Sequence, residues 1–303
     1  IKDIKQEFGA TIADIVDGAT KITDIFQSHE VTKAENWRKM LLSMVNDIRV
    51  MLIKFADRLH NMRTLEYLPQ EKRGRIAKDT LDIYAPFAHR FGLAKIKWEL
   101  EDLAFKYLFP TEYEEISRAL KAKRRERENY IKKFIEPIQA ELKSEGFVFD
   151  IEGRPKHIYS IANKIKKQSK SIDDLYDLFA VRIILDTENV NDCFAVYGIL
   201  SEEYIPIPER FKNYISLPKA NGYRSIHTTV IGPEGKRVEV QIRTRSMHEV
   251  AERGVAAHWK YKEGDPQLES KVENWIVWIR EMFEQASEES TPKQLIESFK
   301  LNL

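Results

Sequence analysis

The hydrophobic period of this chain changes near Gly146, and that change most constrains its fold. Near the start, Ile4, Phe8, Ile12 and Ile15 recur at helical spacing, and residues 1–108 hold no convincing run of period two. After Gly146, runs rich in β-branched and aromatic residues appear, separated by glycine, proline and asparagine: FVFDIEG, DLFAVRIIL, HTTVIG and KRVEVQIRT. The sequence therefore predicts an α+β protein, helical first and built on a mixed sheet after Gly146.

The length of 303 residues fits about two domains. Breaks in the first helical part are expected at Asp17-Gly18, Pro69, Pro86 and Gly92. The predicted segments are an all-helical domain over 1–108, connecting helices over 109–145 with a kink at Pro137, a mixed α/β domain over 146–262 with helices near 157–168 and 191–200, and C-terminal helices over 263–303.

Charge and cysteine content exclude several classes of protein. Lys+Arg 49 nearly cancels Asp+Glu 48, so any basic site must be local. The single cysteine, Cys193, excludes a disulfide framework and a cysteine-rich zinc site, and we expect it to be a small buried apolar side chain in a cytoplasmic protein. No apolar run approaches the roughly 18–20 residues that span a bilayer, so no membrane partner is expected.

A basic segment, GRPKHIYSIANKIKK, follows a predicted strand and opens a helix. It places Arg154, Lys156, Ser160 and Lys164 around a helix N-terminus, where backbone N–H groups and the helix dipole favour anions. The chain contains neither GxxxxGK[ST] nor GxGxxG. The segment therefore predicts a polyphosphate site that is not a Walker loop.

Two carboxylates lie on predicted strands near this segment. In KRVEVQIRT the strand period sends Glu239 and Gln241 to the face opposite Val240. Asp177 sits just before the strand DLFAVRIIL and can meet Glu239 over Mg²⁺, which accepts paired carboxylates together with substrate phosphates. A solvated strand face would alternate in the same way, and either acid alone is more often structural.

A third segment, PERFKNYISLPKANGYRSIHT, interleaves cations with aromatic rings. The cations are Arg210, Lys212, Lys219 and Arg224, and the rings are Tyr214 and Tyr223. This pattern is typical of base stacking combined with phosphate neutralisation. The residues alone thus predict Mg²⁺-dependent phosphotransfer or nucleotidyl transfer, and they leave the acceptor open.

A polar stripe runs along the helical segment KFADRLHNMRT. Steps of four and three residues place Asp57, Asn61 and Thr64 on one helix face. Such a stripe is either a satisfied core network or half of a site.

Several motifs in order resemble the long RelA/SpoT (Rel) family. GRPKHIYS, YDLFAVRI, RFKNYI, NGYRSIHT, EVQIRT and AAHWKYKEG resemble its synthetase domain. VDGATKI, KFADRLHNMRT and APFAHRFGLAKIKWELEDLAFKYL resemble its HD-type hydrolase domain and connecting helices. The resemblance implies a nucleotidyltransferase-like sheet domain that moves the β,γ-pyrophosphate of ATP to the 3′-hydroxyl of GTP or GDP, making pppGpp or ppGpp.

The resemblance also implies roles for individual residues. Asp177 and Glu239 would hold Mg²⁺, and Glu239 would accept the proton of the attacking hydroxyl. Arg154 would stabilise the transferring group and, with Lys156, Ser160 and Lys164, cradle the ATP phosphates. The guanine nucleotide would stack on Tyr223 and meet a set of polar residues: Lys219, Asn221, His227, Arg210, Lys212 and Gln241.

One motif departs from the family. Bifunctional members carry a basic Arg-x-Lys-Asp motif, and here the residues are Arg210-Phe211-Lys212-Asn213. The basic pair supports the bifunctional type, while Asn213 in place of aspartate leaves the metal preference and the synthetase rate open.

For the hydrolase, the resemblance gives Asp57 as the last Mn²⁺ ligand, with Asn61 and Thr64 facing the nucleotide. Its partners, a histidine and a His-Asp pair, are expected upstream, in helices that the family has before the point where this chain begins. The 303 residues contain no His-Asp pair, so this chain is not expected to hydrolyse ppGpp. The longer family protein would do so with Mn²⁺, and its C-terminal regulatory domains would sense the ribosome.

Two other functions stay open. A catalytically silent module would bind guanine nucleotides without turnover, although such a module needs no pair of acids. Template-independent nucleotidyl transfer shares the two-carboxylate logic and would transfer a nucleoside monophosphate instead of pyrophosphate.

Overall fold

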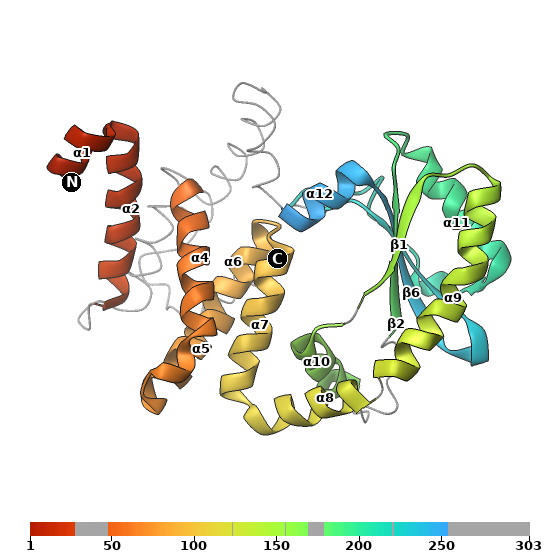
Figure 1. Cartoon of the computed structure of the whole chain (residues 1–303), viewed down its shortest axis with the longest axis horizontal. Coiled ribbons are helices and arrows are strands. Elements are labelled where there is room, and N and C mark those ends of the chain that lie inside the picture. The colour runs from red at the N-terminus through yellow and green to blue at the C-terminus, as the bar shows by residue number, and fades with distance from the viewer. Residues whose placement is uncertain (28–47, 123, 155, 169–178, 220, 254–303) are drawn as a thin grey trace. The chain divides into compact units, whose positions relative to one another are not determined.

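A computed structural model describes residues 1–27, 48–122, 124–154, 156–168, 179–219 and 221–253 (Figure 1). Within these residues the chain forms two compact units. The first holds Ile1–Phe87, and the second holds the described part of Ala88–Lys260. The C-terminal helices predicted over 263–303 lie outside the described residues.

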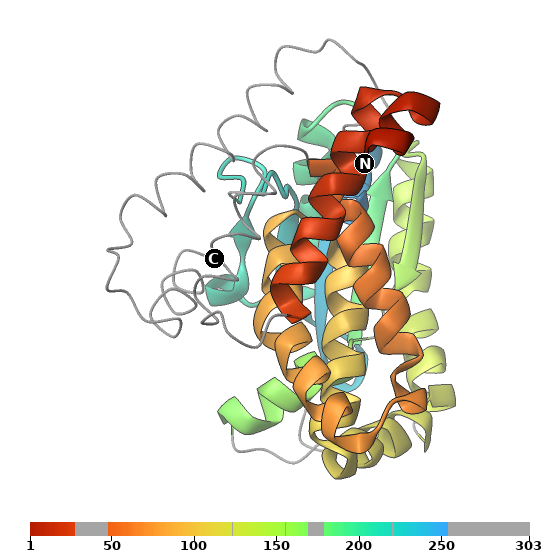
Figure 2. The same ribbon diagram turned by 90° about the vertical axis from the view of Figure 1, so that its left-hand side faces the viewer.

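The first unit is helical in its described part, as the apolar period predicts. Its elements are α1 (Lys2–Phe8), α2 (Ala10–Gln27), α4 (Ile48–Arg63), η1 (Leu65–Tyr67), α5 (Gln70–Asp79), the π-helical turn η2 (Thr80–Tyr84) and the start of α6 (Ala85–Arg90). The helices α2 and α4 pack side by side (Figure 2).

Two of the expected helix breaks are wrong. Asp17-Gly18 lies inside α2, where a Cβ atom on Gly18 would come within 3.0 Å of Val50 on α4, so this glycine serves close helix packing. Pro86 lies in the first turn of α6, directly after η2, whose wider turn lets the helical backbone continue into a proline. The other two are confirmed, because Pro69 precedes α5 and Gly92, with φ 71°, follows α6.

In its described residues the second unit combines helices with a six-stranded mixed sheet. Its elements are α7 (Ala94–Leu108), α8 (Pro110–Ala122), α9 (Arg124–Ser144), β1 (Phe149–Gly153), α10 (Ile158–Gln168), β2 (Phe179–Leu185), α11 (Asn191–Glu203), β3 (Ile205–Pro206), η4 (Pro208–Arg210), β4 (Lys212–Asn213), β5 (Ile226–Ile231), η5 (Pro233–Gly235), β6 (Arg237–Thr244) and α12 (Arg245–Arg253). The strand order is β1-β2-β6-β5-β3, with β4 also on β5, and the β2–β6 pair is parallel whereas the others are antiparallel. The predicted α+β class is confirmed.

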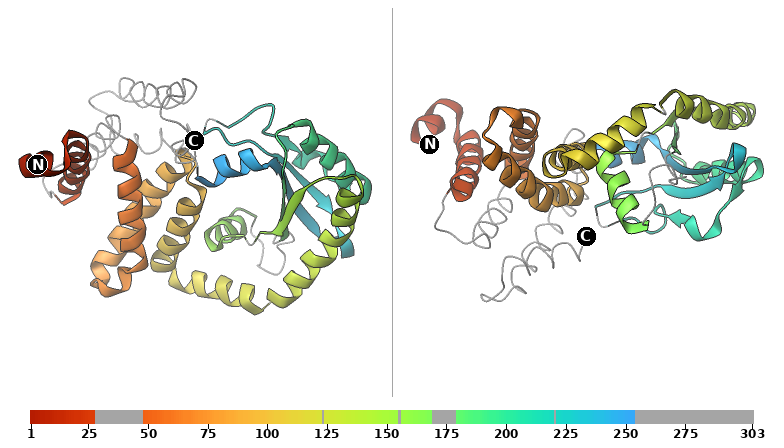
Figure 3. Two further views of the ribbon diagram at one scale, coloured as in Figure 1. Left: turned by 45° about the horizontal axis from the view of Figure 1, so that its top comes forward. Right: turned by 90° about the horizontal axis from the view of Figure 1, so that it is seen from below.

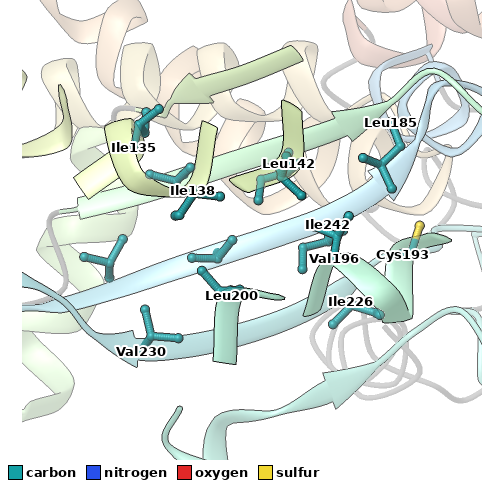
Figure 4. Packing of buried hydrophobic residues seen from close by; sticks show 14 of the residues in the cluster. Ile135, Ile138, Leu142, Leu185, Cys193, Val196, Leu200, Ile226, Val230 and Ile242 are labelled. Carbon is teal, nitrogen blue, oxygen red and sulfur yellow. The ribbon is translucent and has the colours of Figure 1, made fainter. Parts of the chain in front are cut away.

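The apolar core of this unit lies on one face of the sheet. The helices α9 and α11 cover that face and pack Ile138 and Leu200 against strand residues such as Ile242 (Figure 4). Cys193 of α11 is 0% exposed in this core, which confirms the role expected for it. The helices α10 and α12 lie on the opposite side of the sheet (Figure 3). None of the helices in the described part of the chain is long and apolar enough to cross a membrane.

Candidate active site

A row of polar side chains crosses the sheet face opposite the apolar core. The strand register sets Glu152 on β1, Arg182 on β2, Gln241 on β6, His227 on β5 and Lys212 on β4 next to one another. Arg182 and Gln241 are each 6% exposed, which is too little for a merely solvated strand face. The polar face predicted from KRVEVQIRT is therefore largely buried.

Glu239 lies next to this row, on the same face of β6. Its Oε2 is 3.3 Å from Nζ of Lys156, and Gln241 donates a hydrogen bond of 3.2 Å from Nε2 to its Oε1. Burial alone would raise the pKa of the Glu239 carboxyl, but the Lys156 ammonium and the Gln241 hydrogen bond together bring it below its ordinary value. Glu239 is therefore an ionised carboxylate in a half-buried position.

Arg154 follows β1 and prolongs its pairing with β2. Its backbone N–H donates to the Ala180 carbonyl at 2.7 Å, which fixes where the side chain starts. The guanidinium lies 3.9 Å above the ring of Trp98, and its Nη1 donates to Oε1 of Gln241 at 3.5 Å. Burial and the neighbouring Arg182 lower the pKa of Arg154, because both make its positive charge less favourable. The structure thus brings Arg154, Lys156 and Glu239 together around Gln241.

The N-terminus of α10 has a partner within the protein. Oδ1 of Asp102, on α7, accepts the Tyr159 N–H at 2.8 Å, and its Oδ2 lies 3.6 Å from Nδ1 of His157. The sequence predicts a phosphate at this helix N-terminus, but Asp102 accepts one of its backbone N–H groups instead. On the same helix Ser160 is exposed and Lys164 is half-buried.

Tyr223 belongs to an aromatic group beside the polar row. Its hydroxyl lies 2.7 Å from Nε2 of His227, and Tyr214 meets both rings edge-on, with centroids 6.1 Å and 5.1 Å away. Burial lowers the pKa of His227 to about 4 and raises the pKa of Tyr223. At neutral pH the Tyr223 hydroxyl is therefore hydrogen-bonded to a neutral imidazole. Nζ of Lys219 lies 4.9 Å above the Tyr214 ring.

Asn221 uses both ends of its side chain within the protein. Nδ2 donates to the His89 carbonyl at 3.1 Å, and Oδ1 accepts the Tyr223 N–H at 3.2 Å. Gly222, with φ 76°, completes this turn in a conformation that favours glycine. Asn221 therefore holds the loop that carries Tyr223.

Asn213 shapes the turn after β4. Its Oδ1 accepts the N–H groups of Ile215 and Ser216, each at 3.0 Å, and its Nδ2 donates to Ser216 Oγ at 2.8 Å. An aspartate could accept the same two backbone bonds, so the departure from the family motif preserves the turn. The predicted cations Arg210 and Lys212 are exposed on either side of Phe211.

The structure describes one of the two predicted Mg²⁺ ligands of the sheet domain. Asp177 lies outside the described residues, so the structure places Glu239 without its predicted partner. Within the described ranges no cluster of three or more His, Cys, Asp or Glu side chains could hold a metal ion.

The stripe in α4 lies at the surface of the first unit. Asp57 and Asn61 are exposed, and Nδ2 of Asn61 donates to Oδ1 of Asp57 at 3.2 Å. Thr64 donates to the His60 carbonyl at 3.0 Å. A satisfied core network is therefore the wrong reading of this stripe.

Sequence reasoning missed Trp98, Asp102 and Arg182. Trp98 and Asp102 sit in an ordinary helical apolar pattern, and nothing local marks them. Arg182 had a usable signal, because it is the one charged residue in the otherwise apolar strand FAVRIIL.

Comparison with protein families matches residues 153–266 to the region found in RelA / SpoT proteins and residues 1–94 to an HD domain. A GTP pyrophosphokinase from Myxococcus xanthus is 45% identical over 306 residues, which cover 100% of this chain and 40% of that protein. The chain belongs to the RelA/SpoT family. A second RelA/SpoT relative, the guanosine-3′,5′-bis(diphosphate) 3′-pyrophosphohydrolase from Aquifex aeolicus, is 45% identical over 303 residues, 100% of this chain and 42% of its own length.

The resemblance seen in the motifs is thereby confirmed, and this RelA/SpoT chain spans about two fifths of the length of these curated relatives. Among solved structures, the small alarmone synthetase 1 from Bacillus subtilis, bound to its product pppGpp, is 22% identical over 57% of this chain and 94% of that chain. The TM-score of that comparison is 0.37.

Proposed function

We propose that the second unit is a (p)ppGpp synthetase, which transfers the β,γ-pyrophosphate of ATP to the 3′-hydroxyl of GTP or GDP. The observation that carries the proposal is the cluster of Arg154, Lys156 and the ionised Glu239 around Gln241, on the same sheet face as Tyr223. The RelA/SpoT relatives named GTP pyrophosphokinase support it.

The cations of the cluster suit a polyphosphate. Arg154 and Lys156 approach Glu239 from the segment after β1, so their charges converge where the transferring group must sit. In the reaction, the ribose 3′-oxygen forms a bond to the β-phosphorus of ATP while the bond from that phosphorus to the α-phosphate oxygen breaks, and AMP leaves. Arg154 would neutralise the charge on the group in transfer, which is the main contribution of a protein to phosphoryl chemistry.

A divalent cation fits the carboxylate end of this cluster. Glu239 is ionised and already attracts the Lys156 ammonium, so a hard cation can take the same position, with Asp177 proposed as the second ligand. The family and the chemistry support divalent metal use, and we assign Mg²⁺ to this site. Bound there, Mg²⁺ would neutralise phosphate oxygens. Glu239 would accept the hydrogen bond, and finally the proton, of the attacking hydroxyl.

The guanine nucleotide is proposed to bind beside Tyr223. The bond to neutral His227 fixes the tyrosine ring, and Lys219 supplies positive charge nearby. Gln241 lies between His227 and Glu239, so it would link the guanine side of the site to the metal side. Arg210 and Lys212 would meet the acceptor's 5′-phosphates from the exposed edge of the sheet.

The first unit is proposed to belong to the hydrolase of the longer protein, whose relatives include a named pyrophosphohydrolase. Asp57 would be a Mn²⁺ ligand there, and Asn61 and Thr64 would contact nucleotide from the exposed face of α4. Sensing of the ribosome through regulatory domains and a cytoplasmic location are part of the same proposal.

One observation favours a second candidate, a guanine-nucleotide-binding module without turnover. Lys156 pairs with Glu239, and a carboxylate held by an ammonium is a poorer metal ligand and base until that pair opens. Turnover therefore decides between the two functions.

The test is transfer of label from γ-³²P-ATP to GDP or GTP with Mg²⁺, separated by thin-layer chromatography. Wild type should give labelled ppGpp or pppGpp, and Glu239→Gln should give none. Glu234→Gln is the matched control, because it removes an exposed carboxylate on η5 that pairs with Lys236 instead of Lys156. Guanine-nucleotide binding without a labelled product would overturn the synthetase and favour the silent module.

A further inference from the structure

One face of α7 is directed at the candidate site. Lys95, Trp98 and Asp102 recur at steps of three and four residues, so they lie in one line along the helix. Lys95 Nζ is 3.2 Å from Glu252 Oε2, and Asp102 caps α10 through the Tyr159 N–H. Trp98 lies between them and meets the guanidinium of Arg154.

We propose that Trp98 is a positioning residue of the ATP subsite, holding the Arg154 guanidinium over its ring so that this cation points to Gln241 and Glu239. The inference rests on the proposed synthetase function and extends it to a residue of α7. Trp98 acts through Arg154.

The electrostatics explain why an aromatic ring suits this place. Arg154 lies close enough to Arg182 for each positive charge to oppose the other, and burial adds to the cost. A carboxylate partner would offset that cost, but it would also neutralise the charge and occupy N–H donors. The ring of Trp98, 3.9 Å from Cζ of Arg154, attracts the cation through its π-face and takes up none of the in-plane N–H groups. The donors other than the one that Gln241 accepts therefore remain for a phosphate.

Trp98 is itself held in place. The His157 ring stacks on it with centroids 4.6 Å apart and an interplanar angle of 19°, and His157 lies beside the Asp102 carboxylate. Arg154 and His157 therefore both contact α7 through the same indole ring. A ring fixed in this way can set the direction of the guanidinium.

The experiment compares Trp98→Phe with Trp98→Leu. Both variants fill the space with apolar atoms, but only phenylalanine retains a π-face for the cation. Loss of a partly buried cation–π contact predicts that Trp98→Leu weakens ATP–Mg²⁺ binding about 3- to 30-fold, and that Trp98→Phe recovers most of this loss. The affinity for GDP should change less than twofold in both. Tyr113→Leu, which removes a half-buried ring packed on Phe105, is the control for general loss of aromatic packing and should leave ATP binding unchanged.

A second arm places Trp98→Leu in an Arg154→Gln background. There the leucine variant should weaken ATP binding no further, because the cation that the ring holds is gone. Equal ATP affinities for Trp98→Phe and Trp98→Leu, or the same loss with and without Arg154, would overturn the positioning role. Calorimetric binding needs no turnover, so a wild type that binds ATP and makes no product refutes the synthetase while the comparison still decides the role of Trp98.

Discussion

The loop that carries Tyr223 gives the sharpest prediction, through Asn221. Replacing Asn221 with alanine removes the hydrogen bond to the His89 carbonyl and the bond from the Tyr223 N–H, at 3.1 Å and 3.2 Å. Both bonds are at the long end of the range for N–H···O contacts and the side chain is half-buried, so the lower part of the usual net range applies. The two together amount to about 1–2 kcal/mol for the ordered loop.

The free energy that orders the Tyr223 loop also sets how tightly the nucleotide binds. If Tyr223 must be in place before guanine binds, Asn221→Ala should raise the dissociation constant for GDP and the KM for GTP about 5- to 30-fold. The KM for ATP should change less than twofold, because Arg154 and Lys156 belong to other segments.

The assay is calorimetric titration with GDP, followed by steady-state kinetics with each substrate varied in turn. Asn221→Asp keeps an acceptor for the Tyr223 N–H and removes the donor to the His89 carbonyl, so it separates the two bonds. An Asn221→Ala variant with unchanged GDP affinity, or with equal losses for GDP and ATP, would refute the assignment of Asn221 as the support of this loop.

Three further outcomes are expected. Burial lowers the pKa of three histidines to about 4 from 6.5, so the unfolded chain binds more protons between these values and stability is lost as the pH falls from 6.5 to 4, by up to about 1.4 kcal/mol per pH unit for the most buried of them, His227; urea titrations from pH 7 to pH 4 test this for His89, His227 and His248. Glu252→Gln should lower the free energy of unfolding by about 3 kcal/mol, because it removes the carboxylate that lies 3.1 Å from the buried Arg182 and 3.5 Å from the buried Arg243, and it leaves Arg182 with the more exposed Glu152; an unchanged urea midpoint would contradict this. The 303-residue chain should release no pyrophosphate from ppGpp with Mn²⁺, since Asp57 has no His-Asp pair to complete its site; pyrophosphate release at a rate that depends on Asp57 would prove this wrong.

Local patterns predicted the parts of this molecule that depend on one strand or one segment. The alternation in KRVEVQIRT placed Val240 in the core and Glu239 on the polar face, because a strand has only two faces. The run of cations after β1 predicted a polyphosphate site, but it did not predict that Lys156 pairs with Glu239 at 3.3 Å, because that contact depends on how β1 and β6 are brought together.

The features that the sequence did not predict depend on how distant segments pack. Asp102 caps a helix that starts 56 residues later, since α10 begins at Ile158, and no local signal links the two. No local signal links Trp98 with Arg154 either, although the two side chains are in contact. Gly18 resembled a helix break but serves a close contact with Val50, so the meaning of a glycine depended on a neighbour that the sequence pattern cannot name.

The measurement that tests the central claim most directly is to follow which part of ATP is transferred. Parallel reactions with GDP and Mg²⁺ would contain ATP labelled at the α- or the γ-phosphate, with adenine and guanine products separated by chromatography. The proposed chemistry predicts γ-label in the guanine product, α-label in AMP, and equal amounts of the two products. Alpha-label in the guanine product would mean nucleotidyl transfer, and the absence of any labelled guanine product while GDP is bound would mean that the chain binds without turnover.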